Sequence, residues 1–260
     1  MKTRVLIALT LLLTAVVTHA DQSSPKRIRA FAALPDWTGL WEVEAMAKLL
    51  RAPTGQIDAG FVRKEIKIAA PPPYTAEWQA KYQAAMSDTA ALIAQVSRSK
   101  TCVYAFPGTM ESPRMFQVAI APEETLIVFD NGQIRHIYTD GRAHPGKNDL
   151  WPTMLGDSIG HWHGQTLVVD TTAILQGPIS PFAPMAKLSD QARFTERIQM
   201  VNHDRLEDQL TIEDPVALEH PWRITEIYSR ASDIDRMIPF DCGENDRNPV
   251  VDGKMTAAPP

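Results

Sequence analysis

The stretch Thr125–Thr171, TLIVFDNGQIRHIYTDGRAHPGKNDLWPTMLGDSIGHWHGQTLVVDT, decides the fold that we predict for this chain. Two runs rich in β-branched and aromatic residues flank Asn131-Gly132, and two more flank His163-Gly164. Asn-Gly between such runs is a strong signal for a two-residue hairpin turn, and His-Gly is a weaker one. The stretch therefore predicts two antiparallel β-hairpins that are joined by a polar, histidine-bearing connection.

The turn at Asn131-Gly132 predicts the register of the first hairpin. It pairs Ile127 with His136 and Val128 with Arg135, and directly opposed residues share a face. The face with the larger apolar side chains should be covered, and it holds Phe129, Ile134, Ile127, His136 and Tyr138. This register predicts that His136 points into the protein and that Arg135 points to solvent.

The turn at His163-Gly164 predicts the second hairpin in the same way. It pairs Asp157 with Asp170, and it places His161 on the face of those two carboxylates. Trp162, Leu167 and Val169 occupy the opposite face. Like charges that oppose each other on a sheet repel, so a face with two carboxylates and an imidazole is unusual for plain scaffold. A register error of one residue would exchange the two faces.

The N-terminus carries the pattern of a signal peptide over residues 1–20. Lys2 and Arg4 precede an apolar run at residues 5–17, and Thr18-His19-Ala20 follows, with cleavage expected after Ala20. The run is short for a membrane span, although an uncleaved anchor is the other interpretation. We therefore expect a periplasmic or secreted protein with no membrane span after cleavage.

Bulk composition restricts the classes of function. The net charge is −5 and no basic cluster occurs, which argues against nucleic acid as a partner. Gly156-Asp157-Ser158-Ile159-Gly160 has the spacing Gly-x-Ser-x-Gly, but Asp157–Gly160 lies within a predicted strand and not at a strand-to-helix elbow, so a hydrolase is not indicated. No Gly-x-Gly-x-x-Gly or P-loop motif occurs, so no nucleotide cofactor is indicated. We predict a single domain at residues 36–244, after a flexible leader at 21–35 and before a disordered tail at 245–260.

Other segments add strands and one helix to this domain. Residues 74–97 follow three prolines, can be capped by Thr75, and predict a helix packed on the outside of a sheet. Further strands are predicted by alternation at 193–202, 206–214 and 221–230. Glu196 and Glu226 fall on the apolar faces of these strands, so each should be paired or lie at a rim.

Cys102 and Cys242 are the only cysteines of the chain. In an oxidising compartment two lone cysteines most often pair, and closing so long a loop would stabilise the fold by about 5 kcal/mol in the chain-entropy account. The alternative is two free thiols or a nucleophile. No Cys-x-x-Cys supports a redox or zinc-ribbon role.

Several segments together resemble a large and mostly uncharacterised family of secreted bacterial proteins with a β-barrel-like domain. They are DWTGLWEV, YTDGRAHP, GDSIGHWHGQTLVVDT, TIEDP and CGENDRN, and the family pattern reads IYTDGR-x-HP, GHSIGHWEGDTLVVDT, TIEDP and PW in order. This chain departs from the pattern at His163 and Gln165, where an acid is usual, and at Asp157, where His is common. The Gly39-x-Trp41 opening also resembles lipocalin and fatty-acid-binding barrels.

These observations predict a mainly β fold, an antiparallel calycin/lipocalin-like barrel with one additional helix. Its cavity should admit a small apolar or aromatic molecule. We expect an exported, cofactor-independent acid/base lyase or isomerase. The alternatives are a periplasmic carrier of a hydrophobic ligand without catalysis, and a barrel that serves only as a scaffold for interaction. A homodimer is compatible with the sequence.

The candidate site combines titratable groups of the two hairpins and their connection. His161 is predicted as the general base or acid, because imidazole titrates near neutral pH, and a carboxylate would fix its tautomer. The predicted catalytic residues are His161, Asp157, Asp170 and Tyr138. The predicted substrate-binding residues are His136, Asp140, Arg142, His144, Arg114 and Trp151. Three histidines and Asp157 could also supply metal ligands, but no compact ligand motif occurs, so we predict no metal and no cofactor.

Overall fold

The computed structural model of the 260-residue chain describes most of the predicted domain. Two compact units are present, Met1–Ala33 and Leu34–Pro260. The first contains helix α1 (Pro25–Ala32), and the fold below belongs to the second. The described residues are 25–45, 47, 72–88, 105–111, 115–175, 186–237, 250–251 and 254–255. The predicted signal peptide, residues 21–24 of the leader, Cys102, Arg114 and Cys242 lie outside them.

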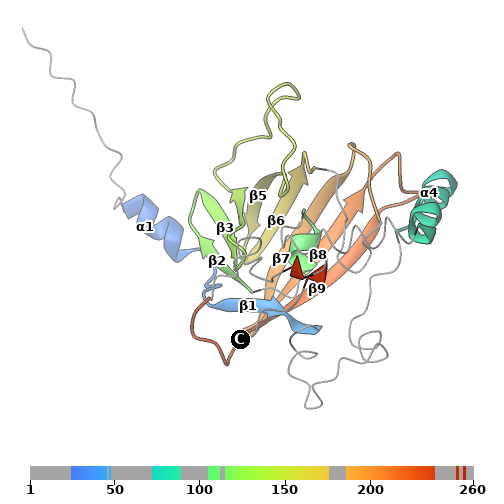
Figure 1. Ribbon diagram of the computed structural model, residues 1–260. Coiled ribbons are helices and arrows are strands. Elements are labelled where there is room, and N and C mark those ends of the chain that lie inside the picture. Colours follow the sequence, from blue (N-terminus) through green and yellow to red (C-terminus); the bar gives the residue numbers. More distant parts are fainter. Residues whose placement is uncertain are drawn as a thin grey trace, which may run out of the picture. The chain divides into compact units, whose positions relative to one another are not determined.

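Nine strands form a closed barrel, in which each strand pairs with the next one along the chain and β1 pairs with β9 (Figure 1). The prediction of a mainly β barrel with a helix is therefore confirmed. The strands are β1 (Leu40–Val43), β2 (Phe116–Ile120), β3 (Glu124–Phe129), β4 (Ile134–Tyr138), β5 (Asp157–His163), β6 (Thr166–Thr172), β7 (Arg193–Asn202), β8 (Arg205–Glu213) and β9 (Trp222–Arg230).

Helices are short in the described part of the second unit. Helix α4 (Ala76–Ser87) lies within the predicted helix, whose last residues are outside the description. Helix α6 (Gly108–Glu111) lies between α4 and β2 in the chain. The C-terminal tail contains two paired strands, β10 (Val250–Val251) and β11 (Lys254–Met255). None of the described helices is both long and apolar enough to span a membrane.

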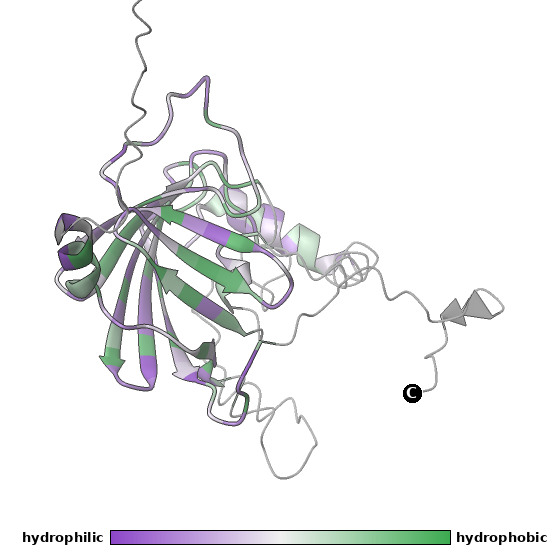
Figure 2. Ribbon diagram, turned by 90° about the vertical axis from the view of Figure 1, so that its left-hand side faces the viewer, coloured by the Kyte–Doolittle hydropathy of each residue, from purple (hydrophilic) through white to green (hydrophobic). Residues whose placement is uncertain are grey.

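Alternating polarity explains why these segments form barrel strands. In β8, Leu206, Leu210 and Ile212 are buried and alternate with exposed or half-buried polar residues. Hydrophobic and hydrophilic bands alternate along the strands in Figure 2 in the same way. Successive side chains of a strand point to opposite faces, so one face of each strand fills the barrel and the other meets solvent.

The first hairpin differs from its prediction by one residue in register. Ile127 pairs with Arg135, and Leu126 pairs with His136. The connection has three residues, because the Phe129 N–H donates to the Gln133 carbonyl, and Gly132 ends it with φ +82°. A three-residue loop that ends in a left-handed glycine is the next commonest hairpin connection after the two-residue turn.

This shift exchanges the two faces of β4. The Arg135 side chain points into the barrel and is 1% exposed, whereas the His136 side chain points outward and is 50% exposed. Both orientations are the opposite of those predicted. One additional turn residue is sufficient for this result, because side chains alternate with a period of two.

The second hairpin differs from its prediction by two residues, which leaves its faces unchanged. His163 pairs with Thr166, so the turn is Gly164-Gln165, and Asp170 pairs with Ile159. Asp157, His161 and Asp170 do share a face, as predicted. That face is the outer surface of the barrel, since the opposite face holds the buried Leu167 and Val169.

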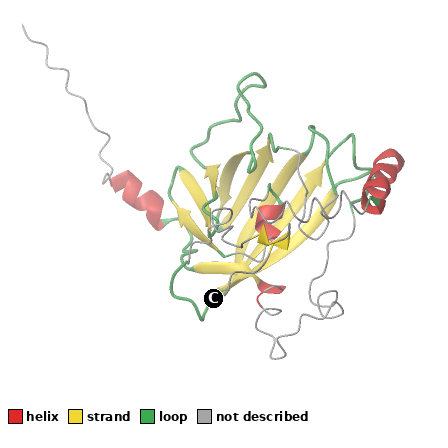
Figure 3. Cartoon of the chain, in the orientation of Figure 1, coloured by secondary structure: helices red, strands yellow, loops and turns green. Residues whose placement is uncertain are grey.

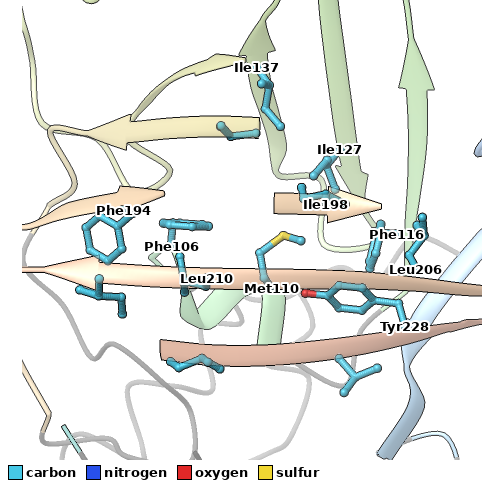
Figure 4. Packing of buried hydrophobic residues seen from close by; sticks show 14 of the residues in the cluster. Phe106, Met110, Phe116, Ile127, Ile137, Phe194, Ile198, Leu206, Leu210 and Tyr228 are labelled. Carbon is cyan, nitrogen blue, oxygen red and sulfur yellow. The ribbon is translucent and has the colours of Figure 1, made fainter. Parts of the chain in front are cut away.

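Large apolar side chains fill the described interior of the barrel. Trp41 of the predicted Gly-x-Trp opening is fully buried, and its indole N–H donates to the Trp37 carbonyl over 3.0 Å. Phe106 and Met110, from the segment around α6, lie among the inner side chains of the strands (Figure 4). The centre of the described barrel is therefore packed with side chains.

β4 and β5 pair in parallel, whereas the other neighbouring strands of the barrel pair antiparallel, and the parallel pairing is short. It contains two register pairs, Ile137 with Ser158 and Tyr138 with Ile159. The long loop of residues 139–156 makes the crossover and extends from one end of the barrel (Figure 3). Gly160 permits the close approach of the two strands, because a Cβ there would lie 2.7 Å from Ile137 Cγ2.

Candidate functional site

A cleft of about 370 Å³ lies at the junction of β4 with the end of the crossover loop. Its size is at the lower end of the range for small-molecule sites. The outward side chains of β4 form one side and the residues that lead into β5 form the other. The lining residues are Gln133, Ile134, His136, Tyr138, Thr153, Met154, Leu155, Gly156, Asp157 and Ser158.

Beside this cleft, one imidazole lies between two carboxylates. His144 Nδ1 bonds to Asp157 Oδ1, and His144 Nε2 lies 2.9 Å from Asp170 Oδ1. His144 and Asp157 are mostly shielded from solvent, and the Asp170 side chain is 46% exposed. The protonated ring has an N–H on each nitrogen, so only the imidazolium form can donate to both carboxylates at once.

The sheet and the loop each contribute to this Asp157–His144–Asp170 cluster. Asp157 begins β5 and Asp170 lies near the end of β6, and both side chains stand on the outer face of the barrel. The crossover loop then brings His144 over that face. The cluster unites three residues of the predicted site, although the imidazole is that of His144.

His161 does not take the predicted place between the carboxylates. Its side chain is exposed on the outer face, and we find no side-chain hydrogen bond to it within the described residues. The pairing of His161 with Asp157 or Asp170 is therefore wrong. Alternation correctly predicted that His161 shares a face with the two carboxylates, but the path of the 18-residue loop that carries His144 leaves no such pattern in the sequence.

Asp140 and Arg142 stabilise the start of the crossover loop. Arg142 Nη2 donates to Asp140 Oδ2 over 2.6 Å, and Arg142 Nε donates to Asp140 Oδ1 over 2.9 Å. The Arg142 guanidinium beside Asp140 holds the pKa of that carboxyl below its usual range. The same guanidinium lies over the Tyr138 ring at 4.0 Å, which restricts this ring beside the cleft.

The other predicted binding residues have different surroundings. His136 Nδ1 lies 2.6 Å from Glu124 Oε1, and its ring stacks beside that of Tyr138 at 6.2 Å. Trp151, near the end of the crossover loop, is 76% exposed. Arg114 lies outside the described residues. His136 and Tyr138 thus line the cleft, and Trp151 precedes the loop residues that line it.

A second polar cluster lies inside the barrel, and its centre is Arg135. Its guanidinium forms a two-point ion pair with Glu196, with 2.8 Å between Nη1 and Oε1. It also donates to Thr171 Oγ1 over 2.9 Å and to Ser158 Oγ over 3.3 Å, and it lies over the Phe106 ring at 4.1 Å. The prediction that Glu196 is paired is confirmed, whereas Arg135 was predicted on the wrong face.

Two more acidic groups belong to the inner face. Asp208 of β8 pairs directly with Glu226 of β9 in the strand register. Burial, and then the charge of Glu196, raise the pKa of Asp208 well above its usual value. Burial raises the pKa of Glu226 to about 7. Asp208 was not among the predicted site residues, although its alternation with Leu206 and Leu210 places it on the inner face.

Ser158 connects the cleft with the interior. It lines the cleft, its hydroxyl lies 2.9 Å from that of Thr171, and it accepts from Arg135. Its neighbour Asp157 lines the same cleft from the outer side. Within the described residues, no group of three or more His, Cys, Asp and Glu side chains is arranged to hold a metal ion.

A comparison with protein-family models finds no match for this chain. A search of the curated proteins finds no similar protein either. The resemblance to the family of secreted bacterial proteins therefore stays a prediction, and a proposal about function depends on the geometry of the site.

Proposed function

We propose that the protein is a cofactor-independent acid/base enzyme of lyase or isomerase type that acts on a small molecule in the β4–β5 cleft. One observation carries this proposal. Asp157 lines the cleft and at the same time bonds to His144, which bonds to Asp170. A carboxylate that is held by an imidazole and faces a small-molecule cleft is an arrangement suited to proton transfer.

Asp157 is the general base in this proposal, and His144 is a positioning residue. Asp157 Oδ1 is engaged by His144, and within the described residues its Oδ2 has no hydrogen bond. Oδ2 can then accept a proton from the substrate and return it at another atom. Asp170 fixes the far nitrogen of His144, so the orientation of Asp157 is determined by two successive contacts. This replaces the predicted role of His161.

The lining of the cleft supports a small substrate that is largely apolar or aromatic. Ile134, Met154 and Leu155 supply apolar surface, and Tyr138 supplies a ring with a hydroxyl group. Polar side chains make up much of the remaining lining, and in small-molecule sites such groups fix the orientation of the ligand. The N-terminal pattern and the family resemblance support export to the periplasm or beyond.

The test incubates the protein in D₂O with a panel of small ketones, esters and alcohols. NMR then measures how fast each compound incorporates deuterium from the solvent. Asp157→Asn should reduce the rate by a factor of about 10² to 10⁴, the usual contribution of a general base. His144→Gln should give a smaller loss. His161→Gln is the matched control, and it should leave the rate unchanged because His161 contacts neither carboxylate.

An unchanged rate in Asp157→Asn would contradict the assignment of the base. If ligands raise the melting temperature and none incorporates deuterium, the carrier function is favoured over the enzyme.

A further inference from the structure

Within the described residues, one edge of β4 is only partly paired, and residues of this strand line the cleft. The Phe129 N–H donates to the Gln133 carbonyl over 2.9 Å, and the Thr139 N–H donates to the Glu123 carbonyl over 2.8 Å. Bonding residues alternate along an antiparallel pair. The backbone groups of Arg135 and Ile137 are therefore directed to β3, and those of the even-numbered residues of β4 are directed to the opposite edge.

On that opposite edge, β5 covers only the end of β4. The two register pairs are Ile137 with Ser158 and Tyr138 with Ile159. Among the residues that the structure describes, these pairs leave the His136 N–H and both backbone groups of Ile134 without a strand partner. Both residues line the cleft. A backbone donor and a carboxylate base, Asp157, thus belong to the same small cleft.

This combination indicates a class of substrate. A backbone N–H stabilises oxygen that gains negative charge, and its fixed position means that little reorganisation is needed when the charge develops. A carboxylate removes a proton from carbon most readily when the neighbouring group can accept the electron pair, as a carbonyl group does. An alcohol of the same shape offers no such acceptor.

We propose that the substrate is a carbonyl compound with a hydrogen on the carbon next to the C=O group, and that the His136 N–H binds the carbonyl oxygen. This inference rests on the proposed function. The C–H bond breaks and its proton goes to Asp157 Oδ2. The electron pair forms a C=C bond, and the carbonyl oxygen becomes an enolate oxygen that accepts the His136 hydrogen bond.

Two outcomes complete the reaction without any further reactant. Asp157 can return the proton to the original carbon or to a conjugated carbon farther along, which is an isomerisation. Alternatively, the enolate electron pair re-forms the C=O bond, a C=C bond forms to the next carbon, and the bond from that carbon to a leaving group breaks; the leaving group takes the proton from Asp157, and this is an elimination. Both belong to the reaction classes proposed above.

The experiment uses phenylacetone as the probe and 1-phenyl-2-propanol as the matched alcohol, with the full mature chain labelled with ¹⁵N. Titration with the ketone should shift the backbone amide signal of His136, and the alcohol should shift it much less. In D₂O the ketone should lose its α-protons at least tenfold faster with the wild type than with Asp157→Asn. His161→Gln should behave as the wild type does.

The two proposals can fail separately. If the ketone shifts the His136 amide but its α-protons exchange no faster than in buffer, carbonyl recognition stands and the acid/base function fails. If Asp157-dependent exchange occurs while the His136 amide is unmoved and the alcohol binds equally well, the carbonyl-binding inference is overturned and the function stands. No effect of the ketone on the His136 amide at any concentration also overturns the inference, and this readout needs no variant.

Discussion

At the scale of single residues, Glu226 should make stability depend on pH. Burial raises its pKa to about 7 from the ordinary glutamate value of 4.5, and Asp208 lies opposite it. The folded state binds this proton more tightly than the unfolded state, so stability falls as the pH rises from about 4.5 to 7 and is constant for this group above that window. The shift corresponds to at most about 3 kcal/mol, since Glu226 is partly exposed.

Glu226→Gln should therefore be more stable than the wild type at pH 8, and the two should be similar near pH 4. Urea unfolding at several pH values measures this difference. Glu219→Gln, which changes an exposed carboxyl, is the control and should follow the wild-type curve. If the free energies of unfolding of Glu226→Gln and the wild type change in parallel with pH, ionisation of Glu226 does not destabilise the folded state, and the prediction is wrong.

Arg135 and Glu196 should be strongly coupled. Glu196→Ala leaves an uncompensated guanidinium in the barrel, and breaking a buried pair from one side costs about 3 to 5 kcal/mol. Glu77→Ala breaks the exposed pair with Lys81, which is worth about 0 to 1 kcal/mol. Chemical unfolding of both variants tests the contrast, and equal losses would contradict it.

At the same scale, the sequence allowed part of this cluster to be predicted. Glu196 on an apolar face indicated a buried partner, and that partner exists. Arg135 could not be identified as the partner, because its face depends on whether the preceding turn has two or three residues. The two turns differ only slightly in local free energy. The choice between them nevertheless reverses the face of β4 to which the Arg135 side chain points.

At the scale of elements, Gly132 determines the turn that sets the face of β4. Its φ is +82°, and a Cβ at this position would have nothing within 4 Å. Gly132→Ala should therefore cost about 1 to 2 kcal/mol from backbone strain alone. Gly146→Ala is the control, because Gly146 is also exposed and is not in the left-handed region, and it should cost much less. Thermal unfolding compares the two variants.

The strands themselves were predictable, and their registers were not. Alternation located both central hairpins and the three long C-terminal strands, because burial of one face leaves a period of two in the sequence. The crossover loop gave no such period. The position of His144 between Asp157 and Asp170 therefore depends on tertiary structure. For this reason the sequence predicted His161, which lies on the same polar face, as the imidazole beside the carboxylates.

At the scale of the whole molecule, a disulfide between Cys102 and Cys242 stays a prediction, since both residues lie outside the described part of the chain. Exported protein should resist alkylation until it is reduced, and mass spectrometry should then find two added groups. Reduction should lower the free energy of unfolding by up to about 5 kcal/mol. Alkylation of both thiols without reduction would show that the bond is absent.

The class of the barrel was predictable because many alternating segments follow one another with short connections. The closure by β1 and β9 and the parallel contact of β4 with β5 depend on long-range packing, so they were not predictable. The filled interior was also missed, because the segment that carries Phe106 and Met110 shows no strand or helix period of its own.

Two narrow seams divide the barrel wall, since β1 with β2 and β4 with β5 share only two register pairs each. The wall therefore consists of a three-stranded panel, β2 to β4, set against a six-stranded one. Arg135 belongs to the small panel and Glu196 to the large one, so their ion pair connects the two panels through the interior of the barrel. Outward movement of the small panel would leave the Arg135 guanidinium unpaired in an apolar interior. The β4–β5 junction beside the cleft can therefore open only as far as the Arg135–Glu196 ion pair stays intact.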